Sequence, residues 1–340
     1  MAVDLFAGCG GLTMGLKAAG FEVAAAVENN PAAVQAYQAN HADVPFMWAR
    51  DICELNGDQL LGELGLRRGE LALLAGSPPC QGFSRLLTLN RINAIDDPRN
   101  ALVDQFLRLV DELLPMALLL ENVPGLGRDP RYQRFLRRIH ELGYTYTDSV
   151  HDAADYGVPQ RRQRLILMAV RGARVELPPR VGVAERGTVR AAIGHLPPAG
   201  KSGDPAHDVS EKRATHVAEF IRRIPEDGGS RRDLGAEAQL QCHVDCDGFY
   251  DVYGRMRWND VSPTITSGFV NPSKGRFLHP VEHRCITPRE GAILQTFPES
   301  YVFPMRLGKY PIATMIGNAF PPLLAKLHAE AIRYTLRNFR

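Results

Sequence analysis

Short apolar runs alternate with amphipathic stretches through the first half of the chain. This alternation predicts strands and helices layered into an open α/β sheet. The runs at 71–75 and 116–120 are almost wholly apolar, as central parallel strands covered on both faces should be. The expected strands are 2–6, 23–27, 71–75, 116–120 and 166–170, and the expected helices are 10–19, 31–40 and 102–114.

The chain loses this regularity between about residues 172 and 283, where Arg, Gly, Pro and Asp become frequent. We interpret 172–283 as a separate, smaller lobe of short strands and loops, whereas 322–336 has the apolar spacing of a helix. We find no internal repeat or low-complexity tract, which argues against solenoid architectures. The expected domains are therefore 1–171, 172–283 and 284–340, with the last segment returning to the first domain.

The composition is that of a soluble globular protein, with 45% hydrophobic residues in a chain of 340. No stretch approaches the roughly 18 to 20 uncharged apolar residues of a membrane span, and the N-terminus lacks a signal peptide, so we expect a cytoplasmic protein. Six cysteines in a chain of this length do not suggest a disulfide framework. We expect reduced thiols, one of which is then available as a nucleophile.

Charge is informative only locally, because the net charge is just +2. Residues 160–190 contain eight arginines, with Glu176 and Glu185 as the acidic residues among them. The arginine fork donates two parallel hydrogen bonds to a phosphate or a guanine edge. This run therefore predicts either a nucleic-acid surface or an ordinary solvated basic face.

A glycine-rich turn follows the first expected strand, with glycines at positions 8, 10 and 11. Glycine lets a ligand approach the backbone closely. The turn departs from the dinucleotide pattern G-x-G-x-x-G because Thr13 stands where the third glycine would be. Glu28 ends the second strand and Asp51 the third, and Glu28 is placed for ribose hydroxyls. The pattern favours a nucleoside-bearing cofactor over a tight turn that binds nothing.

Two prolines stiffen the chain directly before Cys80, at the carboxyl end of an apolar strand. Open α/β sheets bind ligands at this edge, so we expect a presented thiol rather than a core cysteine. Glu121 follows another apolar strand, which makes it a candidate acid beside Cys80. Alternation along the strand after residue 160 would point Arg162 and Arg164 to one side, where both could serve one polar site.

Taken in order, these segments resemble the cytosine-5 DNA methyltransferase family across nearly the whole chain. The resemblance rests on the glycine-rich turn, Pro-Cys-Gln, Glu-Asn-Val, Gln-x-Arg-x-Arg, the segment 284–298 and Gly-Asn-Ala-Phe-Pro-Pro at 317–322. It implies a Rossmann-like S-adenosylmethionine-dependent methyltransferase fold with a target-recognition lobe. The implied activity is transfer of a methyl group from S-adenosylmethionine to carbon 5 of cytosine in double-stranded DNA, leaving S-adenosylhomocysteine.

The resemblance also implies roles for individual residues. Cys80 would attack the base, Glu121 would engage ring N3 and the amino group, and Arg164 would bond the base oxygen and orient Glu121. Arg162 would steady a loop or a phosphate. The cofactor would be bound by Phe6, Gly8, Gly10, Glu28 (ribose), Asp51 (adenine amino group), Pro78, Leu102 and Asn318. The substrate would be contacted by Gln81, Ser84, Arg85, Arg91, Arg257 and Thr264.

The chemistry explains why these groups are needed. Thiolate addition to carbon 6 breaks the aromaticity of cytosine and makes carbon 5 nucleophilic. A paired base hides both ring faces in the stack, so it must be flipped out. We expect residues 82–99 to form a loop that closes over the flipped base, and 172–283 to read the DNA sequence.

Other interpretations remain open from the sequence. Some relatives of this fold methylate transfer RNA, although the large middle lobe argues for duplex DNA. A nicotinamide oxidoreductase would explain the glycines but not Cys80, and a catalytically inactive DNA-binding relative conflicts with the filled catalytic positions. Zinc binding at 242–246 would have only three irregularly spaced ligands, so we expect no metal. We expect a nucleoid-associated monomer, paired functionally with a restriction endonuclease but without stable contact.

Overall fold

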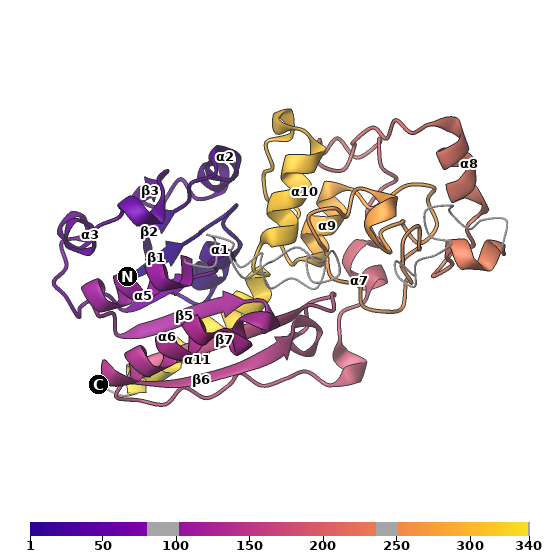
Figure 1. The fold of residues 1–340 in the computed structure, drawn as a ribbon. Helices are drawn as coiled ribbons and strands as arrows, with labels where there is room; N and C mark the ends of the chain where they lie inside the picture. Colours follow the sequence, from indigo (N-terminus) through magenta and orange to yellow (C-terminus); the bar gives the residue numbers. More distant parts are fainter. Residues whose placement is uncertain (80–101, 236–250, 339–340) are drawn as a thin grey trace. The chain divides into compact units, whose positions relative to one another are not determined.

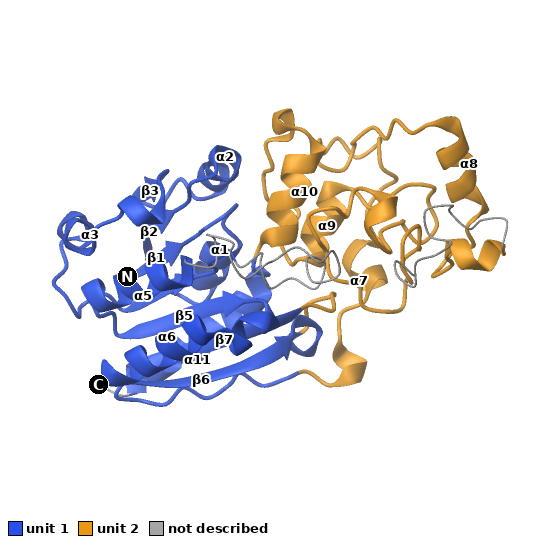
Figure 2. Ribbon diagram, viewed as in Figure 1, with its two compact units in different colours: residues 1–156, 163–180, 320–340 blue, residues 157–162, 181–319 orange. Residues whose placement is uncertain are grey.

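The computed structural model describes residues 1–79, 102–235 and 251–338. The chain forms two compact units, which Figure 2 colours separately. Unit 1 comprises 1–156, 163–180 and 320–340, and unit 2 comprises 157–162 and 181–319. Each unit is therefore assembled from segments far apart in the sequence. The functional division of the chain at residues 171 and 283 stays a prediction.

Unit 1 is built on a seven-stranded sheet in the order β3-β2-β1-β4-β5-β7-β6 (Figure 1). Strands β1 to β5 run parallel to one another, whereas β7 pairs antiparallel with both β5 and β6. This arrangement confirms the mostly parallel α/β sheet expected from the sequence. The strands are β1 (Ala2–Leu5), β2 (Val23–Val27), β3 (Phe46–Trp48), β4 (Leu73–Gly76), β5 (Ala117–Asn122), β6 (Tyr144–Asp152) and β7 (Gln163–Arg171).

Helices pack on the faces of this sheet. Apolar side chains of α3, α5 and α6 share one core with Val3 and Leu5 of β1. Because side chains alternate along a strand, Asp4 points to the opposite face, where α1 contacts α11 and β1. The helices of unit 1 are α1 (Gly11–Ala18), α2 (Pro31–Asn40), α3 (Gly57–Leu64), α5 (Leu102–Leu113), α6 (Pro130–Glu141) and α11 (Pro322–Asn338).

Local sequence explains where several of these elements begin. Helix α2 starts at the predicted residue because Asn30 accepts hydrogen bonds from the backbone N–H groups of Ala32 and Ala33, with Pro31 at the first helical position. Strand β7 is longer than the expected 166–170 because its pairing with β6 continues over all nine residues. Pairing with β6, which the apolar pattern does not record, therefore sets the bounds of β7.

Unit 2 has little regular structure among its described residues. Its helices are α7 (Val189–Ile193), α8 (Thr215–Arg223), α9 (Pro288–Leu294) and α10 (Lys309–Asn318). In the described part of 172–283 the expected short strands are replaced by isolated bridges, such as Arg255 with Leu278. Arg255 is fully buried and donates to the backbone carbonyls of Ile221, Ile224 and His279. Guanidinium groups thus donate hydrogen bonds to buried backbone carbonyls, which strand pairing satisfies in unit 1.

None of the helices in the described residues has the length and apolarity needed to cross a membrane.

Candidate active site

The candidate site lies at the carboxyl ends of the parallel strands of unit 1. The sheet order reverses between β1 and β4, which are hydrogen-bonded neighbours whose next strands lie on opposite sides. The glycine turn follows β1, and the segment leading to Cys80 follows β4. Crevices at such a switch point are where open α/β sheets bind their ligands. The topology therefore brings the two predicted motifs to one edge.

The glycine turn has a strained backbone with open space beside it. Phe6, Gly8 and Gly10 have positive φ angles of 60°, 56° and 95°. The backbone N–H of Gly8 donates to Glu28 Oε2 at 2.9 Å, so the acidic end of β2 is joined to the turn. A Cβ built on Gly8 would meet no atom of the described residues within 4 Å. The missing side chain therefore leaves room for a ligand against the backbone.

Glu121 and Arg164 form the buried ion pair of the site. Arg164 Nε lies 2.7 Å from Glu121 Oε1, and the two side chains are only 15% and 7% exposed. Antiparallel pairing of β5 with the first residues of β7 brings the two groups together. Next to this pair, Asn122 Nδ2 donates to the carbonyl oxygen of Pro78 at 2.9 Å. The end of β5 is thus tied to the chain that leads into Cys80.

Arg162 and Arg164 bond different parts of the chain and belong to different units. The guanidinium of Arg162 is buried in unit 2 and donates to the backbone carbonyls of Ile265, Gly317 and Ala319. Strand β7 begins at residue 163, so alternation along a strand does not extend back to Arg162. The expectation that both arginines serve one polar site stays a prediction. Arg162 holds two distant stretches of unit 2 together.

The remaining predicted residues have the following surroundings. Asp51 accepts from the backbone N–H of Cys53, and the first residue of α5, Leu102, is partly buried against the core of unit 1. Asn318 and Arg257 are exposed in unit 2, where the hydroxyl of Thr264 donates to a backbone carbonyl. Five predicted site residues lie outside the described residues, namely Cys80, Gln81, Ser84, Arg85 and Arg91. The predicted closing loop 82–99 and the cysteines near 242 also lie outside them.

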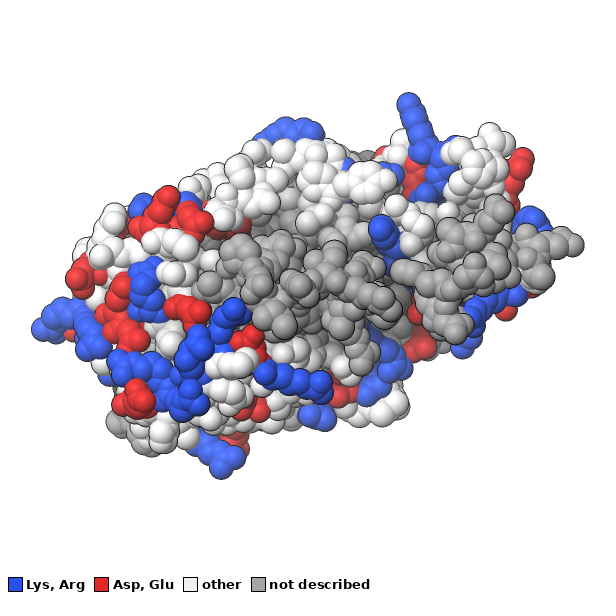
Figure 3. Space-filling view, viewed as in Figure 1, with Lys and Arg blue, Asp and Glu red and all other residues white. Residues whose placement is uncertain are grey.

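The arginine run at 160–190 is divided between the two units, because 163–180 belong to unit 1 and the residues on either side belong to unit 2. Arg180 lies 3.8 Å from Asp155, and Arg190 stacks over the ring of Trp258 with its guanidinium carbon 5.1 Å from the ring centre. On the face of unit 1 near α5 and α6, basic and acidic side chains are interspersed (Figure 3). That face lacks the single-sign field that would attract a polyanion.

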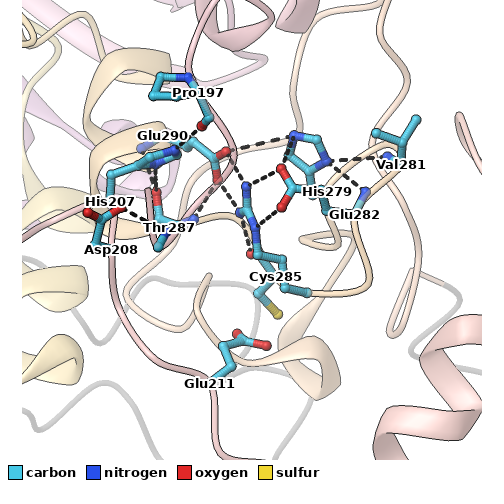
Figure 4. A network of polar contacts seen from close by, with 12 residues as sticks. Pro197, His207, Asp208, Glu211, His279, Val281, Glu282, Cys285, Thr287 and Glu290 are labelled. Atoms are coloured by element: carbon cyan, nitrogen blue, oxygen red, sulfur yellow. Dashed lines mark hydrogen bonds and ion pairs between the residues drawn. The ribbon is translucent and has the colours of Figure 1, made fainter. Parts of the chain in front are cut away.

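The segment 284–290 forms a buried charge network in unit 2 (Figure 4). Arg284 bonds both carboxylate oxygens of Glu290, at 2.7 and 2.8 Å, and also bonds Glu282. Burial pushes the pKa of Glu290 up, but the hydrogen bonds and charge of Arg284 outweigh it and lower the pKa below its ordinary value. Glu290 also caps α9 reciprocally with Thr287. This motif therefore fixes the irregular chain before α9.

Sequence reasoning missed a second polar cluster, beneath the glycine turn. Asp4 is fully buried in β1 and accepts a hydrogen bond from the hydroxyl of Thr13 at 2.6 Å. The hydroxyl of Tyr37 lies 2.9 Å from Thr13 Oγ1. The signal in the sequence is a lone acidic residue inside an apolar strand, because a buried carboxyl needs a partner.

The fold and site together define a class of enzyme. An open α/β sheet with a glycine turn and acidic strand ends at its switch point is the architecture of enzymes that bind a nucleoside cofactor. The buried Glu121–Arg164 pair beside the Pro78 segment adds a polar centre for chemistry at the same edge.

Comparisons with known proteins identify the family. The model of the C-5 cytosine-specific DNA methylase family matches residues 1–334. The chain is 34% identical to the Type II methylase M.HgiDII of Herpetosiphon aurantiacus, covering 97% of this chain and 94% of that protein. It is 32% identical to the Type II methyltransferase M1.HphI of Haemophilus parahaemolyticus, covering 97% and 86%. The chain therefore belongs to the C-5 cytosine-specific DNA methylase family and is a DNA (cytosine-5-)-methyltransferase.

A solved structure agrees on the fold. The putative DNA modification methyltransferase encoded within a prophage of Escherichia coli superposes with a TM-score of 0.74 at 24% identity, covering 99% of each chain. Membership of the family implies the use of S-adenosylmethionine and a DNA substrate.

Proposed function

We propose that this enzyme is a type II modification methyltransferase that methylates carbon 5 of a flipped-out cytosine in a specific double-stranded DNA sequence, with Cys80 as nucleophile. The observation that carries the proposal is the buried Glu121–Arg164 pair, joined through Asn122 to the chain before Cys80. The curated relatives are named as type II enzymes, which supports a partnership with an endonuclease. We propose that the enzyme acts as a monomer, without stable contact to that endonuclease.

Glu121 and Arg164 would handle the charge that develops in the base. When the thiolate of Cys80 adds to carbon 6, electron density moves into the ring toward N3 and the carbonyl oxygen. A carboxyl group at N3 and a guanidinium near the oxygen stabilise that density as it forms. Because Arg164 already bonds Glu121 Oε1, the carboxyl is held in one orientation and its second oxygen is left to face the base. The pair is thus oriented before the substrate arrives.

The residues of unit 1 fit the cofactor. The turn has open backbone at Gly8, and the buried hydroxyl of Ser77 after β4 has no hydrogen-bond partner among the described residues. The backbone N–H of Ser77 donates to the carbonyl oxygen of Leu5, just before that turn. S-adenosylmethionine supplies an electrophilic methyl group when it is bound. Phe6, Gly8 and Glu28 would hold its nucleoside, with Asp51 toward the adenine amino group. Within unit 1 the proposed pocket is completed by Gly10, Pro78 and Leu102, and the contact from Asn318 of unit 2 stays a prediction from the family resemblance.

Sequence recognition would fall to the region 172–283. Residues such as Arg257, exposed in unit 2, are suited to groove or phosphate contacts. Flipping the base costs a few kcal/mol, which contacts from this region and from the segment after Cys80 would offset.

The decisive experiment is covalent trapping on duplex DNA that carries 5-fluorocytosine. In the wild type, a bond forms between sulfur and carbon 6, the methyl group is transferred to carbon 5, and fluorine blocks the elimination that would release the enzyme. We expect Cys80→Ser to abolish both methylation and trapping. Cys53→Ser is the matched control, because Cys53 is an exposed free cysteine to which the proposal gives no role, and the hydrogen bond that Asp51 accepts comes from its backbone N–H. Trapping that persists in Cys80→Ser would show that another nucleophile attacks.

The same assay distinguishes the two polymers. We expect methylation of duplex DNA libraries, with sites that map to one short sequence. Methylation confined to transfer RNA would overturn the assignment of the substrate while leaving the chemistry intact.

A further inference from the structure

Three side chains from different elements meet under the glycine turn of unit 1. Asp4 lies on β1, Thr13 in the first turn of α1 and Tyr37 on α2, and all three are fully buried. When Asp4 is ionised, Thr13 donates its hydroxyl proton to Asp4 Oδ2, and the hydroxyl of Tyr37 then donates to Thr13 Oγ1. The hydrogen bonds therefore run in one direction, from α2 through α1 to β1.

Asp4 supplies the hydrogen-bond acceptor that the N-cap residue of α1 lacks. The N-cap residue of α1 is Gly10, which has no side chain to accept a hydrogen bond, and the first turn contains no acidic residue. Asp4 accepts from both the hydroxyl and the backbone N–H of Thr13, at the positive end of the helix. A residue six positions before the N-cap thus caps the helix and locks α1 to β1.

The same turn is held at two more points. Glu28 accepts from the N–H of Gly8, and His41 Nε2 lies 3.2 Å from the carbonyl oxygen of Gly10. Of these hydrogen bonds, the one between Asp4 and Thr13 joins the strand before the turn to the helix after it. Phe6 sits between them with a φ of 60°, a conformation that a non-glycine residue keeps only when its surroundings hold it.

We propose that Asp4, acting through Thr13 and Tyr37, is a positioning residue that fixes the backbone of residues 6–10 for S-adenosylmethionine. The inference rests on the proposed cofactor site. Asp4 is too buried to touch the ligand, so it acts through the turn. Thr13, at which the sequence departs from the dinucleotide pattern, supplies the hydroxyl that bonds Asp4. Burial raises the pKa of Asp4 to about 7, which fits a carboxyl kept for hydrogen bonding rather than for an ion pair.

The test uses Thr13→Val, which removes the hydroxyl and keeps the branched shape. We expect its dissociation constant for S-adenosylhomocysteine, measured by calorimetry without DNA, to rise about tenfold, as loss of one buried hydrogen bond would produce. The KM for the cofactor should rise with it, while kcat at saturating cofactor stays within about twofold of the wild type. Thr13→Ser restores the hydroxyl and should restore affinity.

Thr335→Val is the matched control, because the hydroxyl of Thr335 bonds a backbone carbonyl within α11. Tyr37→Phe is the second variant, and we expect about a threefold loss of affinity from it because it removes only the outer bond of the chain. Equal affinities of Thr13→Val and Thr335→Val would overturn the inference. If Thr13→Val does not fold, an unchanged affinity of Tyr37→Phe for S-adenosylhomocysteine would overturn the inference.

The failure of the proposed function would look different. A wild-type protein that binds no S-adenosylhomocysteine would overturn the cofactor assignment and this inference with it. A wild type that binds the product and methylates DNA, with Thr13→Val and Tyr37→Phe unaffected in affinity, would overturn the inference alone.

Discussion

The two units satisfy their buried backbone groups in different ways. Unit 1 pairs them in a seven-stranded sheet between layers of helices. Among the described residues of unit 2 the pairing is reduced to isolated bridges, and buried arginines donate to the unpaired carbonyls instead. A sheet offers regular strand ends on which to place a catalytic edge. A chain held by side chains can take an irregular course, which would suit the recognition role proposed for residues 172–283.

This difference predicts which interactions stabilise each unit. Unit 1 depends mainly on apolar burial around the sheet, together with neutral groups sealed inside it. Unit 2 depends more on a small number of charge-assisted hydrogen bonds to backbone carbonyls. Acid and single substitutions should therefore affect the two units differently.

The largest effect should come from acid. Burial lowers the pKa of His41 and His151 to about 4 and of His328 to about 3 in unit 1, and that of His279 to about 4 in unit 2. A depressed histidine pKa favours folding above about 6.5, and this stability is lost as pH falls toward 4. Asp4, with its raised pKa, has the opposite sign and offsets part of the loss.

We therefore expect unit 1 to lose on the order of 5 kcal/mol between pH 6.5 and 4, more than unit 2, since it holds three of these histidines. Hydrogen exchange with mass spectrometry, read separately on peptides from β6 and from α9, measures this difference. Earlier opening of α9 than of β6 on acidification would contradict it.

The next largest effect should come from the core of unit 1. Phe106 of α5 is fully buried, lies beneath Gly76 at the end of β4 and packs near Phe135. Phe106→Ala should lower the free energy of unfolding by about 4 kcal/mol, because it removes apolar contacts and leaves a cavity. Urea denaturation measures this loss. Phe106→Leu, which keeps most of the volume, should cost less than half as much, and equal costs would argue against a packing role.

Much of unit 1 could be predicted from the sequence because its determinants are local. Apolar runs and the Asn30 cap place β2 and α2 at their observed bounds. Glu121 and the Pro78 segment lie at the same edge of the sheet because parallel strands end at one edge. The proximity of Arg164 followed from the family resemblance, and the antiparallel turn of β7 supplies its geometry.

The rest depends on contacts between distant parts of the chain. Arg162 and Arg164 stand two residues apart but belong to different units, because the strand begins between them. No periodicity records that boundary. In the sequence Thr13 is only a departure from a glycine pattern, because its partner Asp4 lies nine residues earlier and on another element. The roles of buried arginines in unit 2 are hidden for the same reason.

A smaller effect than that of Phe106 is expected at the centre of unit 2. Arg255 donates to the carbonyls of Ile221, Ile224, His279 and Glu282. Arg255→Met keeps the apolar stem but leaves these buried acceptors without a donor, which should cost about 3 kcal/mol. The measurement is urea denaturation combined with hydrogen exchange of α8. Two residues away, Arg257→Met alters an exposed side chain and should change stability by less than about 0.5 kcal/mol.

The smallest effect should come from an exposed ion pair of unit 1, which tests whether charge matters there once it is solvated. Lys326 and Glu330 are one helical turn apart on α11, with Nζ 3.7 Å from Oε1 and side chains 39% and 44% exposed. The lysine precedes the glutamate, which is the weaker orientation against the helix dipole. Lys326→Ala should change the free energy of unfolding by about 0.3 kcal/mol or less, and salt should not alter that difference measurably. Thermal unfolding at low and high salt measures it. A loss comparable to that of Arg255→Met would mean that unit 1 depends on charge as much as unit 2 does, and the contrast between sheet burial and guanidinium bonding would then fail.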